Sequence, residues 1–341
     1  MKDILGLKTH CQSQELTISN PRYKAWVEKF TFDELEKDLG IFDITTKVSL
    51  ENKKAKAVIL AKEKGIFAGR QEVEFFLRGF KSVTYKFNKK DSQVLNKGEI
   101  VLELSGPIFD LMKIERIILN LIGRMSGVST LTSRLVKVAK VANSSVLIVP
   151  TRKTLWGLLD KRACALGGGG THRLALDNAV LIKHNHIKAS SVGFEKFLIT
   201  ALCGFIKMQN PNIKFFEVEV ANGKNALIAA RIFADAINVG VKIPFVIMFD
   251  NMKPQEIKKT LNEIKKEYPD DWSKIIFEAS GRINAENMRA YAKTGVNILS
   301  LGMLTHSAKM LDFSMRIAGN PNIPSNVGAR EIPLVLPLCL R

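Results

Sequence analysis

Cationic side chains gather around four consecutive glycines between residues 151 and 187. The set consists of Arg152, Lys153, His172, Arg173 and Lys183. Consecutive glycines cost backbone entropy and give a core nothing to pack, so a fold tolerates them best where the backbone must approach another group closely. The flanking positive charges indicate that this group is an anion. We therefore expect a binding site for a negatively charged molecule here.

Short apolar runs precede these cations. Residues 146–149 (VLIV) end just before Arg152, and residues 179–182 (AVLI) end just before Lys183. Such runs, bounded by polar or turn residues, are typical of buried parallel strands. Further runs follow at 214–220, 245–249, 275–278 and 296–301, with helical segments between them. This alternation predicts a parallel sheet of βα units, closed into a barrel or left open, with a site at the carboxyl edge of its strands. A solvated basic loop after each strand is the alternative explanation for the cations.

Carboxylates lie on the later strands. The run FFEVEV contains Glu217 and Glu219, the next run ends at Asp250, and the one after it ends at Glu278. Desolvated carboxylates are costly without partners, so their place opposite the cations predicts a polar site. Glu219 and Asp250 offer the hard oxygen ligands that suit Mg²⁺ shared with substrate phosphates. We expect Glu217 and Glu219 to point to opposite faces of their strand, so that only one of them can line the lumen of a barrel.

Two further interpretations concern the glycines and histidines of this edge. In the first interpretation, Gly281, Gly302 and the backbone N–H groups before the helix at Thr305 cradle a phosphate. A zinc cluster is the other interpretation, and it would use His172, His184 and His186. Crowding cations and the lack of a nearby cysteine count against the zinc cluster.

The predicted elements divide the chain into two domains. Residues 1–20 give no clear pattern and are predicted to be an extension, and residues 21–128 form an α+β domain with a long helix over 108–125. A second helix over 128–143 leads into an α/β barrel domain of residues 129–316, whose last helix is predicted over 307–316. The C-terminal segment 317–341 is expected to join the first domain. Neither GxGxxG nor GxxxxGK[ST] is present, so a Rossmann or P-loop fold has no support.

The composition is that of a globular protein with a basic excess. The chain has 341 residues, 46% hydrophobic and 25% charged, and a net charge of +18 from 51 basic and 33 acidic side chains. Because the basic residues form no dense block and no zinc-finger or aromatic-basic RNA motif occurs, we expect no nucleic-acid partner. We also expect no membrane partner, since no apolar run reaches the length of a span. The four scattered cysteines favour a reducing, cytoplasmic location.

Taken together in order, the motifs of residues 38–316 resemble the quinolinate phosphoribosyltransferase family, also called carboxylating nicotinate-nucleotide pyrophosphorylases. The motifs are DLGIFDITT, ERIILNLIGRMSGVST, TRKT, GGGGTHR, LIKHNHI, EVEV, FDNM, EASG and LGMLTHS. The resemblance implies an incomplete α/β barrel of parallel strands beside an α+β, sandwich-like N-terminal domain. It implies a homodimer that joins quinolinate to phosphoribosyl pyrophosphate with Mg²⁺, giving nicotinate mononucleotide, pyrophosphate and CO₂.

The resemblance also implies roles for individual residues. Arg152, His172, Arg173 and Lys183 would hold the carboxylates of quinolinate, and Arg116 would enter the site of the neighbouring subunit. Lys153, Glu219 and Asp250 would serve phosphoribosyl pyrophosphate, with the last two holding the metal. The residues near the phosphate end would be Ser280, Gly281, Gly302 and His306.

The chain departs from the family pattern at several positions close to these motifs. His184 and Asn178 each stand where aspartate is usual, Trp156 where proline is common, and Phe42 and Arg282 where glycine is usual. His184 and Arg282 lie nearest the expected site, so they bear on rate and substrate preference more than on the fold. A related ModD-like phosphoribosyltransferase that uses another aromatic acid, and a non-enzymatic basic binding protein on the same scaffold, are the alternative functions.

Overall fold

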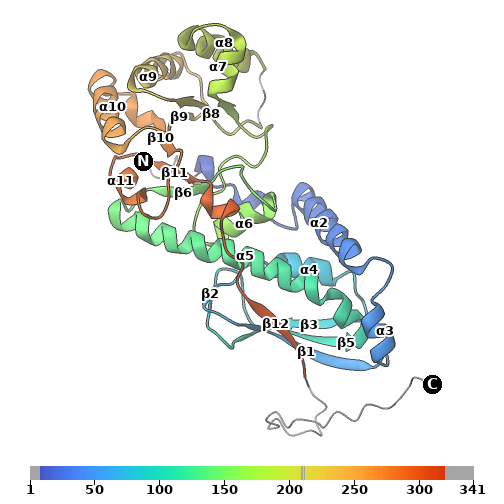
Figure 1. The fold of residues 1–341 in the computed structure, drawn as a ribbon. Helices are drawn as coiled ribbons and strands as arrows, with labels where there is room; N and C mark the ends of the chain where they lie inside the picture. The colour runs from blue at the N-terminus through green and yellow to red at the C-terminus, as the bar shows by residue number, and fades with distance from the viewer. Residues whose placement is uncertain (1–7, 209, 211, 319–341) are drawn as a thin grey trace, which may run out of the picture.

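The computed structural model describes residues 8–208, 210 and 212–318. In this part of the chain, a long helix, α5 (Ile108–Ala142), runs between an antiparallel sheet and a parallel sheet (Figure 1). The core residues of both regions form one continuous apolar cluster that includes the buried face of α5. The two predicted regions therefore share a helix rather than being joined by a linker.

The antiparallel sheet has the strand order β12-β1-β5-β3. Its strands are β1 (Lys54–Ala61), β3 (Thr84–Phe87), β5 (Ile100–Pro107) and β12 (Phe313–Ala318). Along β1 the residues Ala57, Ile59 and Ala61 are buried while their neighbours are less so, which is the alternation of a sheet with one covered face. A small two-stranded sheet, β2 (Gly65–Ile66) with β4 (Val94–Leu95), also contacts α5.

Helices of the N-terminal half pack against α5, and α5 itself packs on this sheet. They are α2 (Pro21–Leu39), α3 (Ile44–Ser49) and α4 (Arg70–Leu77), preceded by a short 3₁₀ turn, η1 (Ser13–Glu15). The start of α2 follows capping rules, because the Asn20 side chain accepts from the N–H groups of Arg22 and Tyr23 and Pro21 occupies the first turn. The predicted helix over 21–38 is confirmed.

The parallel sheet has the strand order β6-β11-β10-β9-β8-β7. Its strands are β6 (Leu147–Pro150), β7 (Val180–Ile182), β8 (Phe216–Val220), β9 (Phe245–Asp250), β10 (Ile275–Ser280) and β11 (Ile298–Leu301). The strands are buried along almost their whole length, as expected for a sheet covered on both faces. The end strands β6 and β7 are not paired with each other, so the barrel is incomplete. The predicted fold class is confirmed.

The helices between these strands complete the βα units (Figure 1). They are α6 (Leu158–Leu166), α7 (His184–Ser190), α8 (Phe194–Met208), α9 (Gly223–Asn238), α10 (Pro254–Glu267), α11 (Met288–Ala292) and α12 (Met303–His306), with a 3₁₀ turn, η2 (Trp272–Lys274), before β10. Within the described residues no single helix is long and apolar enough to cross a membrane, although the bent pair α7–α8 passes the same test of length and composition.

The prediction of two helices over 108–125 and 128–143 was wrong, because α5 is continuous. Gly123 and Gly127 look like helix breakers in the sequence, yet both lie within the helix. A Cβ on Gly123 would lie 2.9 Å from the Leu311 carbonyl oxygen, and one on Gly127 would collide with that of Lys309. These glycines admit the segment that leads into β12, and they do not interrupt the helix.

The helix predicted over 307–316 was also wrong. The chain passes over α5 and then forms β12, which pairs antiparallel with β1 from Phe313 onward. The predicted domain boundary at residue 316 therefore falls within a strand of the antiparallel sheet. Residues 319–341, most of the segment expected to join the first domain, lie outside the described residues.

The described part of the predicted N-terminal extension packs against the rest of the protein. Residues 8–16 run along the end of the barrel, with His10, Gln12 and Leu16 buried. The glycine run lies against this segment and against the barrel wall. A Cβ on Gly170 would come within 2.7 Å of the His10 carbonyl oxygen, and one on Gly169 within 2.9 Å of that of Ile148. The glycines thus allow close packing of backbone on backbone, where we had expected contact with an anion.

A buried ion-pair network joins α6 to the N-terminal half. Arg162 Nε lies 2.7 Å from Glu72 Oε1, and its Nη1 donates to the Leu16 carbonyl oxygen at 2.7 Å. The Tyr23 hydroxyl donates to the same Glu72 oxygen at 2.7 Å. Burial raises the pKa of Glu72, while the nearby Arg162 charge opposes that shift. This network fixes the N-terminal segment and α2 against the barrel.

Candidate active site

A pocket opens at the carboxyl edge of the parallel strands. Its lining residues are Thr151, Arg152, His172, Arg173, Leu181, Lys183, Glu219, Met248, Ser280 and Ser300. Six of these were predicted as site residues from the sequence. Arg152 and Lys183 follow β6 and β7, Glu219 and Ser280 lie at the carboxyl ends of β8 and β10, and His172 and Arg173 follow the glycine run. Parallel strands place their carboxyl ends on one edge, so positions far apart in sequence meet here.

The cations of the pocket carry more positive charge than their neighbours neutralise. Arg152 is exposed and makes no salt bridge with any residue in the described part of the chain, and neither does Arg173. Arg173 Nη1 donates to the Ala179 carbonyl oxygen at 3.2 Å, which fixes the side chain's direction. Lys183 Nζ lies 2.6 Å from Glu219 Oε1. Burial and the nearby Arg152 charge lower the pKa of Arg173. Such a site attracts an anion with more than one charge.

A buried arginine holds the loop that carries Arg152. From α5, Arg124 donates to both oxygens of Asp160, from Nε at 2.9 Å and from Nη2 at 2.8 Å. Asp160 Oδ2 also accepts from the backbone N–H groups of Leu155 and Trp156, at 2.9 and 3.1 Å. The carboxylate therefore ties the loop after β6 to the central helix, because its oxygens are shared between side chain and backbone donors.

The two glutamates of β8 both face inward. Glu217 is completely buried below the pocket, and Glu219 lines the pocket itself. The expectation that they point to opposite faces of the strand was wrong, because side chains two residues apart on a strand lie on the same face of the sheet. Asp250 and Ser280 are directly paired at the ends of β9 and β10. Glu219 and Asp250 thus end adjacent strands at the same edge.

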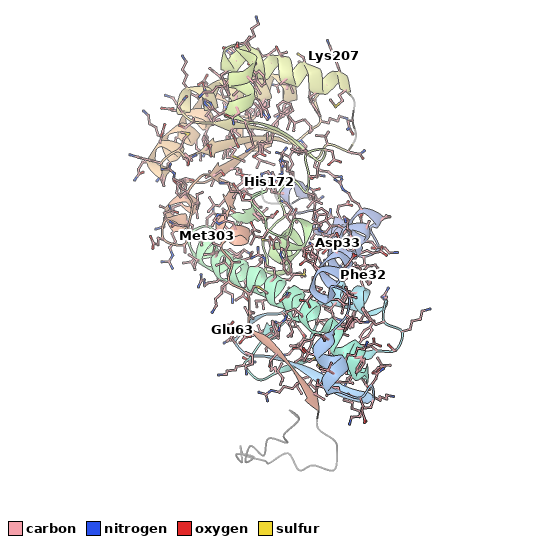
Figure 2. All side chains as sticks on the ribbon, turned by 45° about the vertical axis from the view of Figure 1, so that its right-hand side comes forward. Phe32, Asp33, Glu63, His172, Lys207 and Met303 are labelled. Atoms are coloured by element: carbon pink, nitrogen blue, oxygen red, sulfur yellow. The ribbon has the colours of Figure 1, made fainter. Side chains whose placement is uncertain are left out.

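Below the pocket, four buried side chains converge: His10, His172, Glu217 and Glu278, with their ligand-type atoms all within 4.8 Å of one another. His172 lies near the middle of the molecule in Figure 2. Its Nε2 is 3.4 Å from Glu217 Oε2 and 3.5 Å from Glu278 Oε2, and His10 Nε2 is 3.4 Å from the same Glu278 oxygen. The His10 ring stacks on Phe215 at 4.3 Å between centroids. Both histidines and both glutamates therefore form one cluster inside the barrel.

Burial disfavours the charged form of all four groups. It lowers the pKa of His10 to about 3, and it lowers the pKa of His172 well below its usual range, helped by the positive charges of Lys161 and Arg173. Burial and the charge of Glu278 raise the pKa of Glu217, and burial raises that of Glu278. Groups of this kind can surround a metal ion. Here, however, the Arg173 N–H donates to His172 Nδ1 at 2.7 Å, so a neutral His172 carries its proton on Nε2 and offers no lone pair to a cation.

The zinc cluster proposed as an alternative does not form in the described part of the chain. His184 and His186 are exposed on α7, and His186 Nδ1 accepts from the Lys183 N–H at 2.9 Å. The only group of metal-ligating side chains found among the described residues contains His172 but neither of them.

The remaining predicted residues lie beside the pocket or away from it. Lys153 is exposed on the loop after β6, and Gly281 follows Ser280 with a φ of +90°. Gly302 lies against the ring of His306 at the start of α12, near Thr151. Arg116 is exposed on α5 and does not line the pocket. Arg282, one of the departures from the family pattern, adopts a φ of +53°, the conformation that favours the usual glycine.

Sequence reasoning missed His10, Gln12 and Lys161. Lys161 is buried on α6 and donates from Nζ to the Thr171 carbonyl oxygen at 2.7 Å. Nothing in the sequence around Lys161 distinguishes it from an exposed lysine. No motif surrounds His10 or Gln12, and only the three-dimensional contact with the glycine-rich loop reveals them.

The fold is an incomplete α/β barrel, and the cation-rich pocket at its mouth suits an anionic ligand. Family comparison gives the finer result. Residues 128–316 match the model of the quinolinate phosphoribosyl transferase C-terminal domain, and residues 43–126 match that of the N-terminal domain. The chain therefore belongs to the quinolinate phosphoribosyl transferase family and is a pentosyltransferase.

Individual relatives agree with this membership. The chain is 36% identical over 285 residues to the probable nicotinate-nucleotide pyrophosphorylase [carboxylating] of Methanothermobacter thermautotrophicus, covering 83% of this chain and 95% of that protein. It is 32% identical to the nicotinate-nucleotide pyrophosphorylase [carboxylating] of Rattus norvegicus, covering 79% and 84%. The crystal structure of the Ehrlichia chaffeensis nicotinate-nucleotide pyrophosphorylase matches with a TM-score of 0.70 at 30% identity, covering 85% of this chain and 98% of that one.

Proposed function

We propose that the pocket at the barrel mouth binds quinolinate and phosphoribosyl pyrophosphate and joins them, with loss of pyrophosphate and CO₂, to give nicotinate mononucleotide for NAD biosynthesis. The observation that carries this proposal is the pairing of an excess of cations with two carboxylates at one strand edge. Arg152, Arg173 and Lys183 match a planar dianion with adjacent carboxylates. His172 lies behind them, held by the buried glutamates.

The chemistry follows from these residue types. The bond between the ribose C1 and the pyrophosphate oxygen breaks while the pyridine nitrogen forms a bond to that carbon. Positive charge develops on the ribose, and the carboxylates of Glu219 and Asp250 stabilise it electrostatically. The ring nitrogen is then cationic, so it can accept the electron pair when the neighbouring carboxylate leaves as CO₂, and a proton replaces that carboxylate on the ring. The enzyme's main contribution is to position the two substrates.

The carboxylates at this edge also fit Mg²⁺, which we include in the proposal. Glu219 is largely buried and Asp250 is partly exposed, and both present hard oxygen atoms beside the expected phosphate position. Bound there, Mg²⁺ would neutralise charge on the pyrophosphate leaving group. Lys153, on the exposed loop after β6, would contact the same phosphates, with Ser280, Gly281, Gly302 and His306 nearby.

We further propose a homodimer in which Arg116 completes the site of the neighbouring subunit. Two observations support it. Arg116 is exposed and does not line the pocket of its own chain. Exposed apolar side chains also gather around α3, where Ile41 and Val48 are 94% and 77% exposed, as expected for a surface that a second copy covers.

Mixing two inactive variants tests this arrangement. If Arg116 serves the partner, Arg116→Ala and Arg152→Ala proteins mixed under subunit exchange should regain activity, because half of the dimers then contain one intact site. Random exchange of equal amounts should restore about a quarter of the wild-type activity. No recovery, despite demonstrated subunit exchange, would exclude the shared site.

The activity itself is tested directly. Purified protein incubated with phosphoribosyl pyrophosphate, Mg²⁺ and quinolinate labelled in the carboxylate beside the ring nitrogen should release labelled CO₂ and form nicotinate mononucleotide in equal amounts. The control omits phosphoribosyl pyrophosphate. Absence of turnover by folded protein, or turnover only with another aromatic acid, would reject the assignment. A cytoplasmic location completes the proposal and fits the free cysteines Cys11, Cys164 and Cys203.

A further inference from the structure

The segment formed by residues 8–16, which we call the N-terminal strap, binds the turn that carries His172 and Arg173. The His10 carbonyl oxygen accepts from the N–H groups of both Thr171 and His172, at 2.7 and 3.0 Å. In return, the Gln12 N–H donates to Thr171 Oγ1 at 3.0 Å. These hydrogen bonds join the strap to the turn next to β6, where the Gly170 N–H donates to the Ile148 carbonyl oxygen at 2.8 Å.

The Gln12 side chain extends this pairing to the far side of the turn. Its Nε2 donates to Asn178 Oδ1 at 2.8 Å and to the His172 carbonyl oxygen at 3.4 Å. Asn178 Oδ1 also accepts from the Leu174 N–H at 3.0 Å. Because Gln12 is almost completely buried, water cannot replace these bonds if its amide is removed.

The turn needs this support because its backbone is strained. His172 adopts a φ of +52°, a left-handed conformation that is uncommon for residues other than glycine. Such conformations persist only where surrounding contacts determine them. The conformation is useful here, since it directs His172 inward to Glu217 and Glu278 while the next residue, Arg173, lines the pocket.

We propose that the N-terminal strap is a working part of the quinolinate site, with Gln12 as a positioning residue that holds the strained His172–Arg173 turn in its binding conformation. This inference rests on the proposed function, because it takes Arg173 to contact the substrate. The strap lies before residue 43, where the match to the family's domain models begins. Among the described residues, neither His10 nor Gln12 makes a hydrogen bond or ion pair with Glu219 or Asp250. We therefore expect the effect of Gln12 to fall on quinolinate and not on phosphoribosyl pyrophosphate.

A pair of glutamine variants tests the strap. Gln12→Ala removes the side-chain bonds to the turn, whereas Gln14→Ala, two residues later, changes an exposed side chain with no contact to the turn. We expect Gln12→Ala to raise the KM for quinolinate about tenfold. The KM for phosphoribosyl pyrophosphate and kcat should stay within about twofold, and Gln14→Ala should match the wild type. If quinolinate KM is unchanged, or if kcat and both KM values change together, the strap is only structural and the proposal fails.

Asn178 gives a second test should Gln12→Ala fail to fold. Asn178→Asp keeps an oxygen that accepts from Gln12 and Leu174, so its quinolinate KM should stay near the wild-type value. Asn178→Ala loses the acceptor, and its quinolinate KM should rise as it does in Gln12→Ala. Equal KM values in the two variants would overturn the proposal.

Arg173→Ala separates this inference from the proposed function. If Arg173→Ala raises the quinolinate KM and Gln12→Ala does not, the substrate clamp stands and the strap's role is rejected. If Arg173→Ala itself leaves the quinolinate KM unchanged, the clamp assignment fails and the strap's role fails with it.

Discussion

Two groups of arginines in this protein carry the same charge in different surroundings. At the domain junction, Arg124 and Arg162 are matched by carboxylates: Arg124 by Asp160, and Arg162 by Glu72 and Asp91. At the barrel mouth, Arg152 and Arg173 make no salt bridge within the described residues. The junction arginines hold the protein together, and the mouth arginines keep their charge available for a ligand. Among these four arginines, the presence of a carboxylate partner, which the composition does not reveal, separates the structural ones from those proposed to bind the substrate.

The largest expected effect lies at the junction. Arg124→Ala would leave Asp160 buried without its charged partner, which typically destabilises a protein by about 3–5 kcal/mol. Urea denaturation should therefore show a large loss of unfolding free energy. Arg134→Ala is the control, because this residue is exposed on the same helix and makes no salt bridge there. A loss below about 1 kcal/mol would contradict the structural role of the junction arginine.

The opposite result is expected at the mouth. Arg152→Ala removes a cation that contributes little to folding, so the melting temperature should change by no more than a few degrees. The KM for quinolinate should rise at least about a hundredfold, equivalent to about 2.7 kcal/mol. Steady-state kinetics beside Arg78→Ala, an exposed arginine remote from the pocket, provides the measurement. If Arg152→Ala left the KM for quinolinate unchanged but lowered the melting temperature strongly, Arg152 would be a structural arginine like those at the junction.

Lys161 is a third kind of cation, buried without a salt bridge. Burial, reinforced by the charges of Arg152 and Arg173, lowers its pKa to about 7. The unfolded chain, with a lysine pKa of about 10.4, binds more protons than the folded one between these values, so this group makes the unfolding free energy rise with pH above about 7. Lys161→Met should reduce that rise by about 2 kcal/mol between pH 7 and 9. Urea denaturation at pH 7 and pH 9 measures the unfolding free energy of each protein. An equal rise of that free energy with pH in the variant and the wild type would contradict the prediction.

The smallest effect concerns a hydroxyl at the junction. Tyr23→Phe removes the donor to Glu72 but leaves Arg162 in place, so the expected loss of unfolding free energy is about 1 kcal/mol. Tyr85→Phe is the matched control, since its hydroxyl makes no hydrogen bond within the described part of the chain. Similar losses in both variants would show that Tyr23 acts by packing alone.

Periodicity in the sequence was enough to predict the parallel sheet and its carboxyl edge. The six apolar runs became β6–β11, and six of the predicted site residues line one pocket. The errors arose where a contact distant in sequence decides the conformation. Gly123 and Gly127 suggest a helix end, but they accommodate the segment before β12. Residues 307–316 suggest a helix, but pairing with β1 makes their last part a strand.

The buried part of the site was beyond sequence reasoning for the same reason. His10 is 162 positions before His172, and nothing near it suggests a partner. Its place is fixed by a stacked Phe215 and by backbone hydrogen bonds to the glycine-rich loop. The glycine run did predict a close approach, but the neighbour turned out to be protein backbone.

The continuity of α5 has a mechanical consequence. At 35 residues this helix is about 52 Å long, and it crosses the point, near residue 127, where the two family domain models meet. Rotating one sheet relative to the other would require α5 to bend at its buried middle. Any movement that closes the pocket would therefore have to come from the short loops at its rim. Cutting the chain between the two sequence domains would divide one continuous helix and would not release two independent domains.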